Sequence, residues 1–287
     1  MATGAFYAPE MNGSSYYWFL ADSNGACNLK GGWLKLNDYW YYADSQGRLA
    51  HYEWKKLGGK WYYFDNSCTM LTGPQMINDS ETGSYDYYLF NENGVLQSGG
   101  WVKYNNYWYY AGNGSKLAKG WKKINNKWYY FGSSCQMATG YYSIYEEGKQ
   151  GTYYFDDNGV MQTGWIKLGT STSTYYYYAT SSGALVKGWK KINNKWYYFD
   201  DTYRMSDGLC EIDGEYYYFK DGAMKTGWIQ SGSVWYYANS SGVLCRNEWL
   251  KSGGKWYYFN DYCCMVTGYK YIDGKRYHFG SDGALKS

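Results

Sequence analysis

The sequence contains very little histidine and proline. Its 287 residues include two histidines, His51 and His278, and two prolines. Histidine is the most frequent general acid and base in enzymes and a common metal ligand. Its scarcity argues against most catalytic triads and His-rich metal sites. From the sequence as a whole we expect a protein that is not an enzyme and that holds no metal and no cofactor.

The chain also lacks an excess of charge of one sign and any long apolar run. Its 28 Lys and Arg nearly balance its 25 Asp and Glu, and the formal net charge is +3. This balance predicts neither a nucleic-acid partner nor attraction to a membrane surface. No apolar run approaches the roughly 18 residues that span a bilayer. The first ten residues, MATGAFYAPE, lack the basic and apolar regions of a signal peptide, so a secreted protein with this sequence would be a processed or cloned segment.

The seven cysteines form an odd number, so at least one thiol is free or pairs with another chain. Cys68, Cys135 and Cys263 occupy one repeated position that is usually glycine, and we expect them to be small buried thiols. A disulfide between Cys245 and a neighbouring turn remains open at this stage.

Aromatic residues are abundant and follow a repeat. The chain has 41 Tyr and 16 Trp, and a cluster of the form W-Y-Y-F/A recurs thirteen times at steps of 19 to 26 residues. We call the first position of this cluster the anchor. Eight of the tryptophans lie at anchors, and the other eight precede an anchor and are called first tryptophans. A period of this length predicts a repeat architecture.

The interval between paired tryptophans predicts a β-hairpin. Trp121 and Trp128 are separated by six residues with Asn125-Asn126 in the middle, and six other pairs have the same spacing. Asn, Asp and Gly tolerate the positive φ that a two-residue hairpin turn requires. Because side chains alternate along a strand, Trp121, Lys123, Trp128 and Tyr130 should share one face of the hairpin.

The hairpin repeats are themselves arranged in a longer repeat. Nine residues after most anchors there is an apolar residue, such as Leu49, Met70 or Met137, which we call the plug and expect to belong to the core. The copies fall into three kinds that recur in order every 59 to 68 residues. This order predicts three hairpins per superhelical turn, so that equivalent positions lie along one side. Recent triplication alone would also produce it.

These patterns predict an all-β fold, a β-solenoid of about thirteen hairpin repeats of ~20 residues each. We expect residues 1–11 to form an N-terminal flank and residues 12–287 to form a single repetitive domain.

Two segments resemble a known family. The segment GWKKINNKWYYFGSSCQMATG, residues 120–140, resembles the choline-binding, or cell-wall-binding, repeat of Gram-positive surface proteins and phage lysins. The segment YYFDDNGVMQTGW, residues 153–165, is similar to the repeats of glucan-binding domains and of clostridial toxin receptor-binding regions. The resemblance implies a non-catalytic β-solenoid that binds ligands in grooves between neighbouring hairpins.

The resemblance also implies aromatic cages, each made of two rings from one hairpin and one from the next, with a Met often nearby. Ring faces suit a quaternary ammonium, which has no hydrogen to donate. The candidate ligand-binding residues are Trp33, Trp40, Tyr42, Trp54, Trp61, Tyr63, Trp101, Trp108, Tyr110, Trp121, Trp128, Tyr130, Trp165, Trp189, Trp196, Tyr198, Trp228, Trp235, Tyr237, Trp249, Trp256 and Tyr258. Lys35, Lys103, Lys123 and Lys191 should lie on the aromatic face. Arg276 and His278 would place cations in the last cage.

We therefore expect a multivalent module of a secreted or surface-attached bacterial protein. Its predicted partner is choline on teichoic or lipoteichoic acid. An α-glucan or another polysaccharide is the alternative in the same class, because sugars stack on the same rings. A structural stalk or adhesin surface that binds a host protein is the alternative from a different class.

Overall fold

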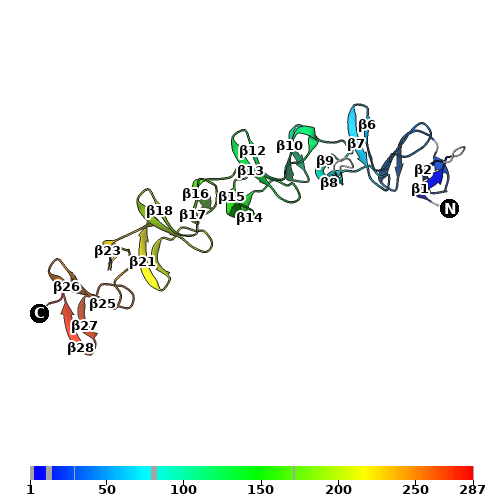
Figure 1. Ribbon diagram of the computed structural model, residues 1–287. Helices are drawn as coiled ribbons and strands as arrows, with labels where there is room; N and C mark the ends of the chain where they lie inside the picture. Colours follow the sequence, from blue (N-terminus) through cyan, green and yellow to red (C-terminus); the bar gives the residue numbers. More distant parts are fainter. Residues whose placement is uncertain (1–2, 11–14, 29, 79–82, 171, 287) are drawn as a thin grey trace. The chain divides into compact units, whose positions relative to one another are not determined.

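The computed structural model describes residues 3–10, 15–28, 30–78, 83–170 and 172–286, and antiparallel hairpins account for most of this chain (Figure 1). The strands in these ranges form thirteen separate small sheets, each made of strands that are consecutive in the sequence. The all-β class and the number of hairpins are therefore confirmed. The arrangement of three hairpins per superhelical turn stays a prediction.

Most strands have five or six residues. In the first half of the chain they are β1 (Gly4–Pro9), β2 (Tyr16–Ala21), β3 (Cys27–Asn28), β4 (Gly32–Leu36), β5 (Tyr39–Ala43), β6 (Glu53–Leu57), β7 (Lys60–Phe64), β8 (Gly73–Asn78), β9 (Tyr85–Phe90), β10 (Gly100–Tyr104), β11 (Tyr107–Ala111), β12 (Gly120–Ile124), β13 (Lys127–Phe131) and β14 (Gly140–Glu146). The second half contains β15 (Lys149–Phe155), β16 (Gly164–Gly169), β17 (Thr174–Ala179), β18 (Gly188–Ile192), β19 (Lys195–Phe199), β20 (Gly208–Ile212), β21 (Glu215–Lys220), β22 (Ala223–Met224), β23 (Gly227–Ser231), β24 (Val234–Ala238), β25 (Glu248–Ser252), β26 (Lys255–Phe259), β27 (Gly268–Ile272) and β28 (Lys275–Phe279). A short 3₁₀ helix, η1 (Asn113–Ser115), follows β11.

The hairpin register agrees with the prediction from side-chain alternation. In β12 and β13, Trp121 pairs with Tyr130 and Lys123 pairs with Trp128. The turn residues Asn125 and Asn126 have φ of 47° and 64°. Both values are those of a two-residue turn whose twist matches that of the flanking strands.

The first hairpin begins earlier than the sequence analysis placed the start of the repeats. Gly4–Pro9 forms β1 and pairs along its whole length with Tyr16–Ala21 of β2. This segment contains no tryptophan, so the aromatic pattern gave no sign that it pairs. Most of the expected flank is thus a strand of the first repeat.

The plug residue connects each hairpin to the one before it. Met70 forms a bridge with Phe64, the last residue of its own hairpin, and its N–H donates to the carbonyl of Trp40 in the preceding hairpin at 2.8 Å. Leu49, Leu96, Leu117, Met137, Met161, Leu185, Met205, Leu244, Met265 and Leu285 make equivalent bonds to the preceding anchor. Phe64 and Phe131 are 0 % exposed. Each repeat therefore buries its core against a neighbour.

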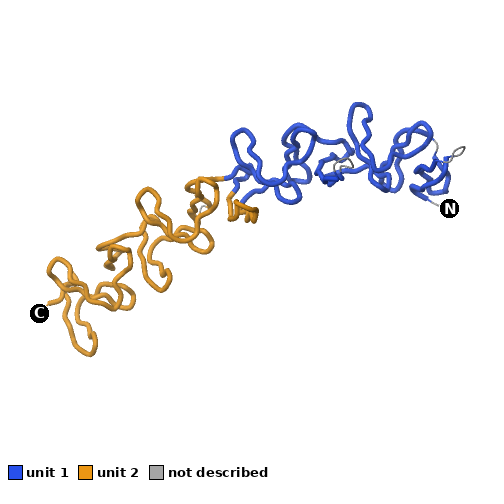
Figure 2. Tube along the Cα trace, viewed as in Figure 1, with its two compact units in different colours: residues 1–140, 155–161 blue, residues 141–154, 162–287 orange. Residues whose placement is uncertain are grey.

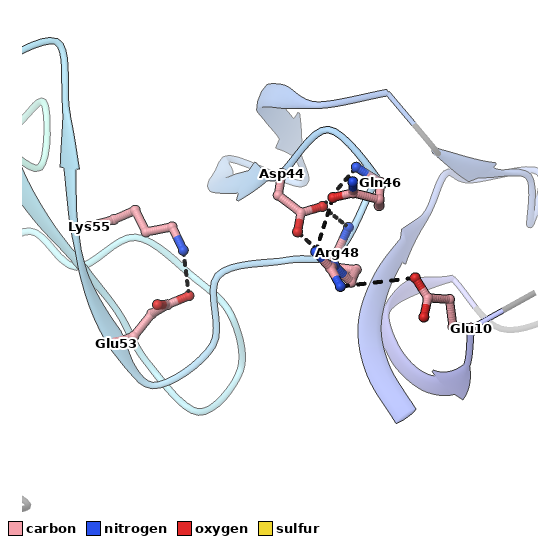
Figure 3. A network of polar contacts seen from close by, with 6 residues as sticks. All are labelled: Glu10, Asp44, Gln46, Arg48, Glu53 and Lys55. Carbon is pink, nitrogen blue, oxygen red and sulfur yellow. Dashed lines mark hydrogen bonds and ion pairs between the residues drawn. The ribbon is translucent and has the colours of Figure 1, made fainter. Parts of the chain in front are cut away.

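Side-chain oxygens hold the turns that follow the hairpins. Asp44 Oδ1 accepts hydrogen bonds from the N–H groups of Gln46 and Arg48 at 2.9 and 3.0 Å (Figure 3). Arg48 Nε donates to Asp44 Oδ2 at 2.7 Å, and its guanidinium lies 3.9 Å from Glu10. Burial raises the pKa of Asp44, but the hydrogen bonds from Arg48 and Gln46 outweigh burial and hold this pKa below its ordinary value. Turn carboxylates of this kind thus satisfy backbone donors.

The cysteines agree with the expectation of buried thiols. All seven thiols are free. Cys68, Cys135 and Cys263 are 0 % exposed and have φ of 64°, 61° and 59°, so each occupies a left-handed turn position. Burial raises the pKa of Cys68 to about 12 and that of Cys135 to about 11. A thiol with such a pKa is rarely a thiolate at neutral pH and reacts slowly.

Thiol labelling at pH 8 should therefore proceed in two phases. Cys27 is exposed and should react with a disulfide reagent first. Cys68 and Cys135 should react more slowly than an unperturbed thiol by on the order of a hundredfold or more, because a rise of two units in pKa lowers the thiolate fraction by that factor and burial also restricts access. Mass spectrometry of peptides labelled in native buffer and in guanidinium would test this. Rapid native labelling of Cys135 would contradict the buried position.

The chain divides into two compact units, residues 1–140 with 155–161 and residues 141–154 with 162–287 (Figure 2). Each unit is built of consecutive hairpins. That residues 12–287 form a single repetitive domain stays a prediction. A search of the described ranges for helices found none with the length and apolar character needed to span a membrane.

Candidate ligand site between consecutive hairpins

The first tryptophan of a hairpin lies between its own hairpin and the next one. The ring of Trp33 on β4 lies 6.2 Å from that of Trp40 and 5.4 Å from that of Tyr42, both on β5. It also lies 4.9 Å from Tyr62 and 5.9 Å from Phe64, both on β7 of the next hairpin. Most of these contacts are edge-to-face, the geometry that aromatic pairs prefer. One indole therefore fixes the spacing of two hairpins.

A pocket opens beside this indole. It has a volume of about 290 Å³ and is lined by Trp33, Trp40, Tyr62, Met70 and Asn93. Two rings come from one hairpin, the third ring and the thioether come from the next, and the amide comes from the turn after that. Trp33 and Trp40 are 39 % and 41 % exposed, so a ligand can reach both indoles.

The same arrangement recurs in the second unit. A pocket of about 320 Å³ is lined by Trp189, Trp196, Tyr217 and Met224 together with Ser240 and Ser241. A pocket of about 520 Å³ is lined by Trp165, Thr174, Tyr175, Tyr176, Tyr197, Met205, Asp207 and Asp221. We call these three sites the Trp33, Trp189 and Trp165 pockets.

Two other tryptophan pairs repeat the ring contacts. Trp101 lies 6.4 Å from Trp108 and 4.9 Å from Tyr129 of the next hairpin. Trp228 lies 6.2 Å from Trp235 and 4.7 Å from Tyr257. The contact set is therefore a property of the repeat.

A glycine in the following turn makes room for the pocket methionine. Gly94 has φ of +72°, and a Cβ at this position would lie within 2.2 Å of Met70 Sδ. Gly222 has the same relation to Met205, with a Cβ position 2.1 Å from its Sδ. Where the plug is Leu49, the next turn instead carries Cys68, and the two side chains pack in one core cluster. The size of the plug is thus matched to the turn residue beside it.

The lining of the Trp33 pocket suits a compact organic cation. Three ring faces or edges and a thioether surround the space, and such groups attract a cation that has been separated from water. The amide of Asn93 is the polar group in the lining. A ligand without hydrogen-bond donors would give up few hydrogen bonds to water on entering this pocket.

Comparison with known families agrees with this geometry. A model described as a choline-binding repeat matches residues 118–150, 147–187 and 186–224. A model described as a putative cell wall binding repeat matches residues 31–49, 53–67, 99–114, 226–244, 247–261 and 267–285. The chain belongs to the choline-binding repeat family.

Solved structures of similar choline-binding proteins cover most of the chain. CbpJ from Streptococcus pneumoniae TIGR4 is 27 % identical with a TM-score of 0.66, and the alignment covers 90 % of this chain and 100 % of that one. Choline binding protein F from Streptococcus pneumoniae is 25 % identical with a TM-score of 0.51, and the alignment covers 93 % and 100 %. Among curated proteins, a sequence search returned no significant match.

The choline-binding repeats bring many of the predicted site residues together in pairs. Trp33 with Trp40 and Trp189 with Trp196 line pockets, and Trp165 lines a third with Tyr176. Trp121 lies 6.3 Å from Trp128. Trp54 and Trp249 each lie 5.0 Å from a tyrosine of the next hairpin, Tyr88 and Tyr277. Trp61 and Trp256 are each 44 % exposed. That these residues contact a ligand stays a prediction.

The tyrosines that were predicted as ligand-binding residues are not the tyrosines that line the pockets. They lie 5.1 to 5.4 Å from the first tryptophan of their own hairpin and buttress it: Tyr42, Tyr63, Tyr110, Tyr130, Tyr198, Tyr237 and Tyr258. Tyr63 is only 5 % exposed. The ring that completes each described pocket is instead the residue after the anchor of the next hairpin, such as Tyr62, Tyr197 or Tyr217.

Sequence reasoning missed Tyr62, Tyr197 and Tyr217, and only the family resemblance implied a methionine near the cages. Met70, Met205 and Met224 were expected to be core residues, and they both pack in the repeat and line pockets. Alternation does place Tyr62 on the face opposite to Trp61. Alternation alone does not identify Tyr62 as a pocket residue, because it does not show that the previous hairpin stacks on this face.

The lysines that were predicted on the aromatic face do lie beside the anchors. The Nζ atoms of Lys35, Lys103 and Lys123 are 5.9, 5.9 and 6.0 Å from the ring centroids of their cross-strand tryptophans. Lys191 pairs with Trp196 in the same register. These contacts are cation–π interactions at the exposed side of the repeat.

The last hairpin differs from the others, as expected. Tyr269 replaces the first tryptophan, the Arg276 guanidinium lies 4.1 Å from its ring centroid, and the His278 ring stacks on it at 4.3 Å. The other histidine, His51, stacks on Trp18 at 5.2 Å, and its Nε2 lies 3.1 Å from the Asn66 carbonyl oxygen. No group of three or more His, Cys, Asp or Glu side chains in the described ranges is placed to hold a metal ion.

Proposed function

We propose that the protein is a non-catalytic, multivalent binding module that attaches to a bacterial cell surface. Each competent pocket holds the quaternary ammonium of a choline group between consecutive hairpins. The choline is carried by teichoic or lipoteichoic acid, and the protein acts as a secreted, wall-associated molecule.

The lining of the Trp33 pocket carries this proposal. Trp33, Trp40 and Tyr62 supply three rings around one space, and Met70 supplies a polarisable thioether. Each ring contact with a desolvated cation contributes about 0.5 to 2 kcal/mol. The family match and the names of CbpJ and choline binding protein F point to the same ligand.

Repetition converts weak sites into firm attachment. Individual pockets of this kind are shallow, with half-exposed walls, so each should bind weakly. When a polymer carries many copies of the ligand, each binding event raises the effective concentration for the next one. Attachment should therefore depend on the number of intact pockets.

A choline titration of wild type and Trp40→Ala tests the proposal. Wild type should show a saturable near-ultraviolet circular dichroism change at millimolar choline that sodium chloride does not reproduce. Trp40→Ala removes one half-exposed wall, and affinity at that one site should fall about tenfold, the equivalent of 1.4 kcal/mol, while the other sites titrate unchanged. Calorimetry would count the sites.

Tyr39→Ala is the matched control. Tyr39 precedes Trp40 on β5, is 59 % exposed and points to the other face of the strand. Its removal should leave the choline titration unchanged. A flat choline titration of folded wild type would disprove the proposal, and binding to an α-glucan in the same preparation would favour the carbohydrate alternative.

A further inference from the structure

The Trp165 pocket differs from the other two in size and in polarity. Its volume is about 520 Å³, against about 290 Å³ and 320 Å³ for the Trp33 and Trp189 pockets. Tyr176 stands at the anchor in place of tryptophan, and the carboxylates of Asp207 and Asp221 belong to the lining. A ligand in this pocket meets two acidic groups as well as aromatic rings.

Asp207 replaces a neutral residue of the repeat, whereas the turn position of Asp221 is also acidic in the last repeat, where Asp282 forms an ion pair with Lys255. Asp207 lies two residues after the plug Met205, where equivalent repeats carry Thr72, Thr139 and Thr267. Asp221 occupies the turn position that corresponds to Asn93 in the Trp33 pocket. The Trp189 pocket has Ser240 and Ser241 in this region. Among the three pockets, the Trp165 pocket is therefore the one with an acidic lining.

The fold holds one of the two carboxylates in place. Asp207 Oδ1 accepts a hydrogen bond from the N–H of Gly222 at 3.0 Å, which ties it to the turn that carries Asp221. The hydrogen bonds and ion pairs found among the described residues include none to the Asp221 carboxylate. The Asp221 carboxylate can therefore accept a hydrogen bond from a ligand without breaking a contact of the fold.

The cations near this pocket are held on its tyrosines. Arg204 lies 4.0 Å from the ring centroid of Tyr175, and Lys167 Nζ lies 5.9 Å from that of Tyr176. The neighbouring Tyr177 hydroxyl raises the pKa of Arg204, so the arginine keeps its positive charge. These positive charges would oppose a cationic ligand, and the two carboxylates offset them.

We propose that the Trp165 pocket binds a protonated amine, an organic cation that keeps N–H donors, in preference to a quaternary ammonium. The proposal extends the proposed function, since it takes the other pockets to be sites for quaternary ammonium. Charge-assisted hydrogen bonds from N–H to carboxylate are about twice as strong as neutral ones, and a quaternary nitrogen cannot form them. A larger cavity also leaves room for a cation that retains part of its hydration.

The test is a calorimetric titration with ethanolamine, N-methylethanolamine, N,N-dimethylethanolamine and choline. This series keeps the single positive charge and removes the N–H donors stepwise. Wild type should bind ethanolamine at one site per chain, and affinity at that site should fall at least tenfold along the series. The double variant Asp207→Thr/Asp221→Asn restores the residues found in equivalent repeats and should weaken ethanolamine binding at least tenfold.

Two further variants keep the result interpretable. Asp221→Asn alone leaves the Asp207 bond to Gly222 intact and should still weaken ethanolamine severalfold. Asp213→Asn removes an exposed turn carboxylate between β20 and β21 that is not part of the lining, and it should have no effect. If Asp213→Asn lost as much ethanolamine affinity as Asp221→Asn, the proposal would be overturned, because the loss would then follow from the lower negative charge of the chain and not from the pocket.

The outcome separates this proposal from the proposed function. Saturable choline binding without an ethanolamine site would overturn the amine pocket and leave choline attachment standing. Ethanolamine binding that the double variant does not weaken would likewise overturn it. An ethanolamine site that responds to the double variant, in a protein that does not bind choline, would support the amine pocket and disprove choline attachment.

Discussion

Phe131→Ala is expected to lower the free energy of unfolding of its part of the chain by about 3 to 5 kcal/mol, the usual cost of removing a buried phenylalanine. Phe131 is 0 % exposed and packs with Ile124 and Tyr129. It also lies 5.8 Å from Trp101, the first tryptophan of the preceding hairpin. Since a repeat contacts mainly its neighbours, the loss should appear as early unfolding of the adjoining hairpins. Guanidinium titration followed by tryptophan fluorescence would measure it.

Tyr107→Ala provides the comparison for this variant. Tyr107 begins β11 in the preceding hairpin and is 52 % exposed. Its removal should change stability by no more than about 0.5 kcal/mol, as for most surface positions. If the two variants unfolded at the same guanidinium concentration, Phe131 would not be the core residue described above.

Gly94→Ala is expected both to destabilise the protein and to close the Trp33 pocket. An alanine at φ of +72° is strained, and its Cβ would lie within 2.2 Å of Met70 Sδ. Backbone strain of about 1 to 2 kcal/mol and overpacking of about 1 to 3 kcal/mol should add, for a total of about 2 to 5 kcal/mol. Because Met70 lines the pocket, its displacement should also remove one choline site from a calorimetric titration.

Gly59→Ala separates strain from the collision. Gly59 has φ of +78°, but nothing lies within 4 Å of a Cβ there, so this variant should lose only the backbone component of about 1 to 2 kcal/mol. Combining Gly94→Ala with Met70→Ala removes the colliding thioether, and stability should partly recover. A single Gly94→Ala variant no less stable than Gly59→Ala would contradict the match between plug and turn.

Local chemistry made the hairpins predictable. Trp121 and Trp128 at a fixed spacing around two asparagines determine both the turn and the register, because few residues tolerate the φ values required. The start of the first hairpin was harder to predict from the sequence. β1 lacks the tryptophan that marks most repeats, and its sequence GAFYAP has no alternation of polar and apolar residues that would indicate a strand.

The candidate site was only partly predictable, because its residues come from three repeats. Trp33 and Trp40 share a hairpin, so alternation placed them together. Tyr62 and Asn93 reach the same space only through the stacking of later repeats. Side-chain alternation along a strand gives the face of each residue and contains no information on which hairpin that face will meet. The match of Met70 to Gly94 depends on the same stacking.

The main-chain links between hairpins also determine how each unit would respond to tension. Met70 bonds to Trp40 and Leu96 bonds to Trp61, each through one N–H, at 2.8 and 2.9 Å. A force that separates neighbouring repeats therefore loads one such link at a time instead of a broad sheet in shear. Each released repeat of about 20 residues can extend by roughly 70 Å before the next link is loaded. A tethered molecule of this kind would lengthen in successive small steps and limit the peak force on its bound ligands.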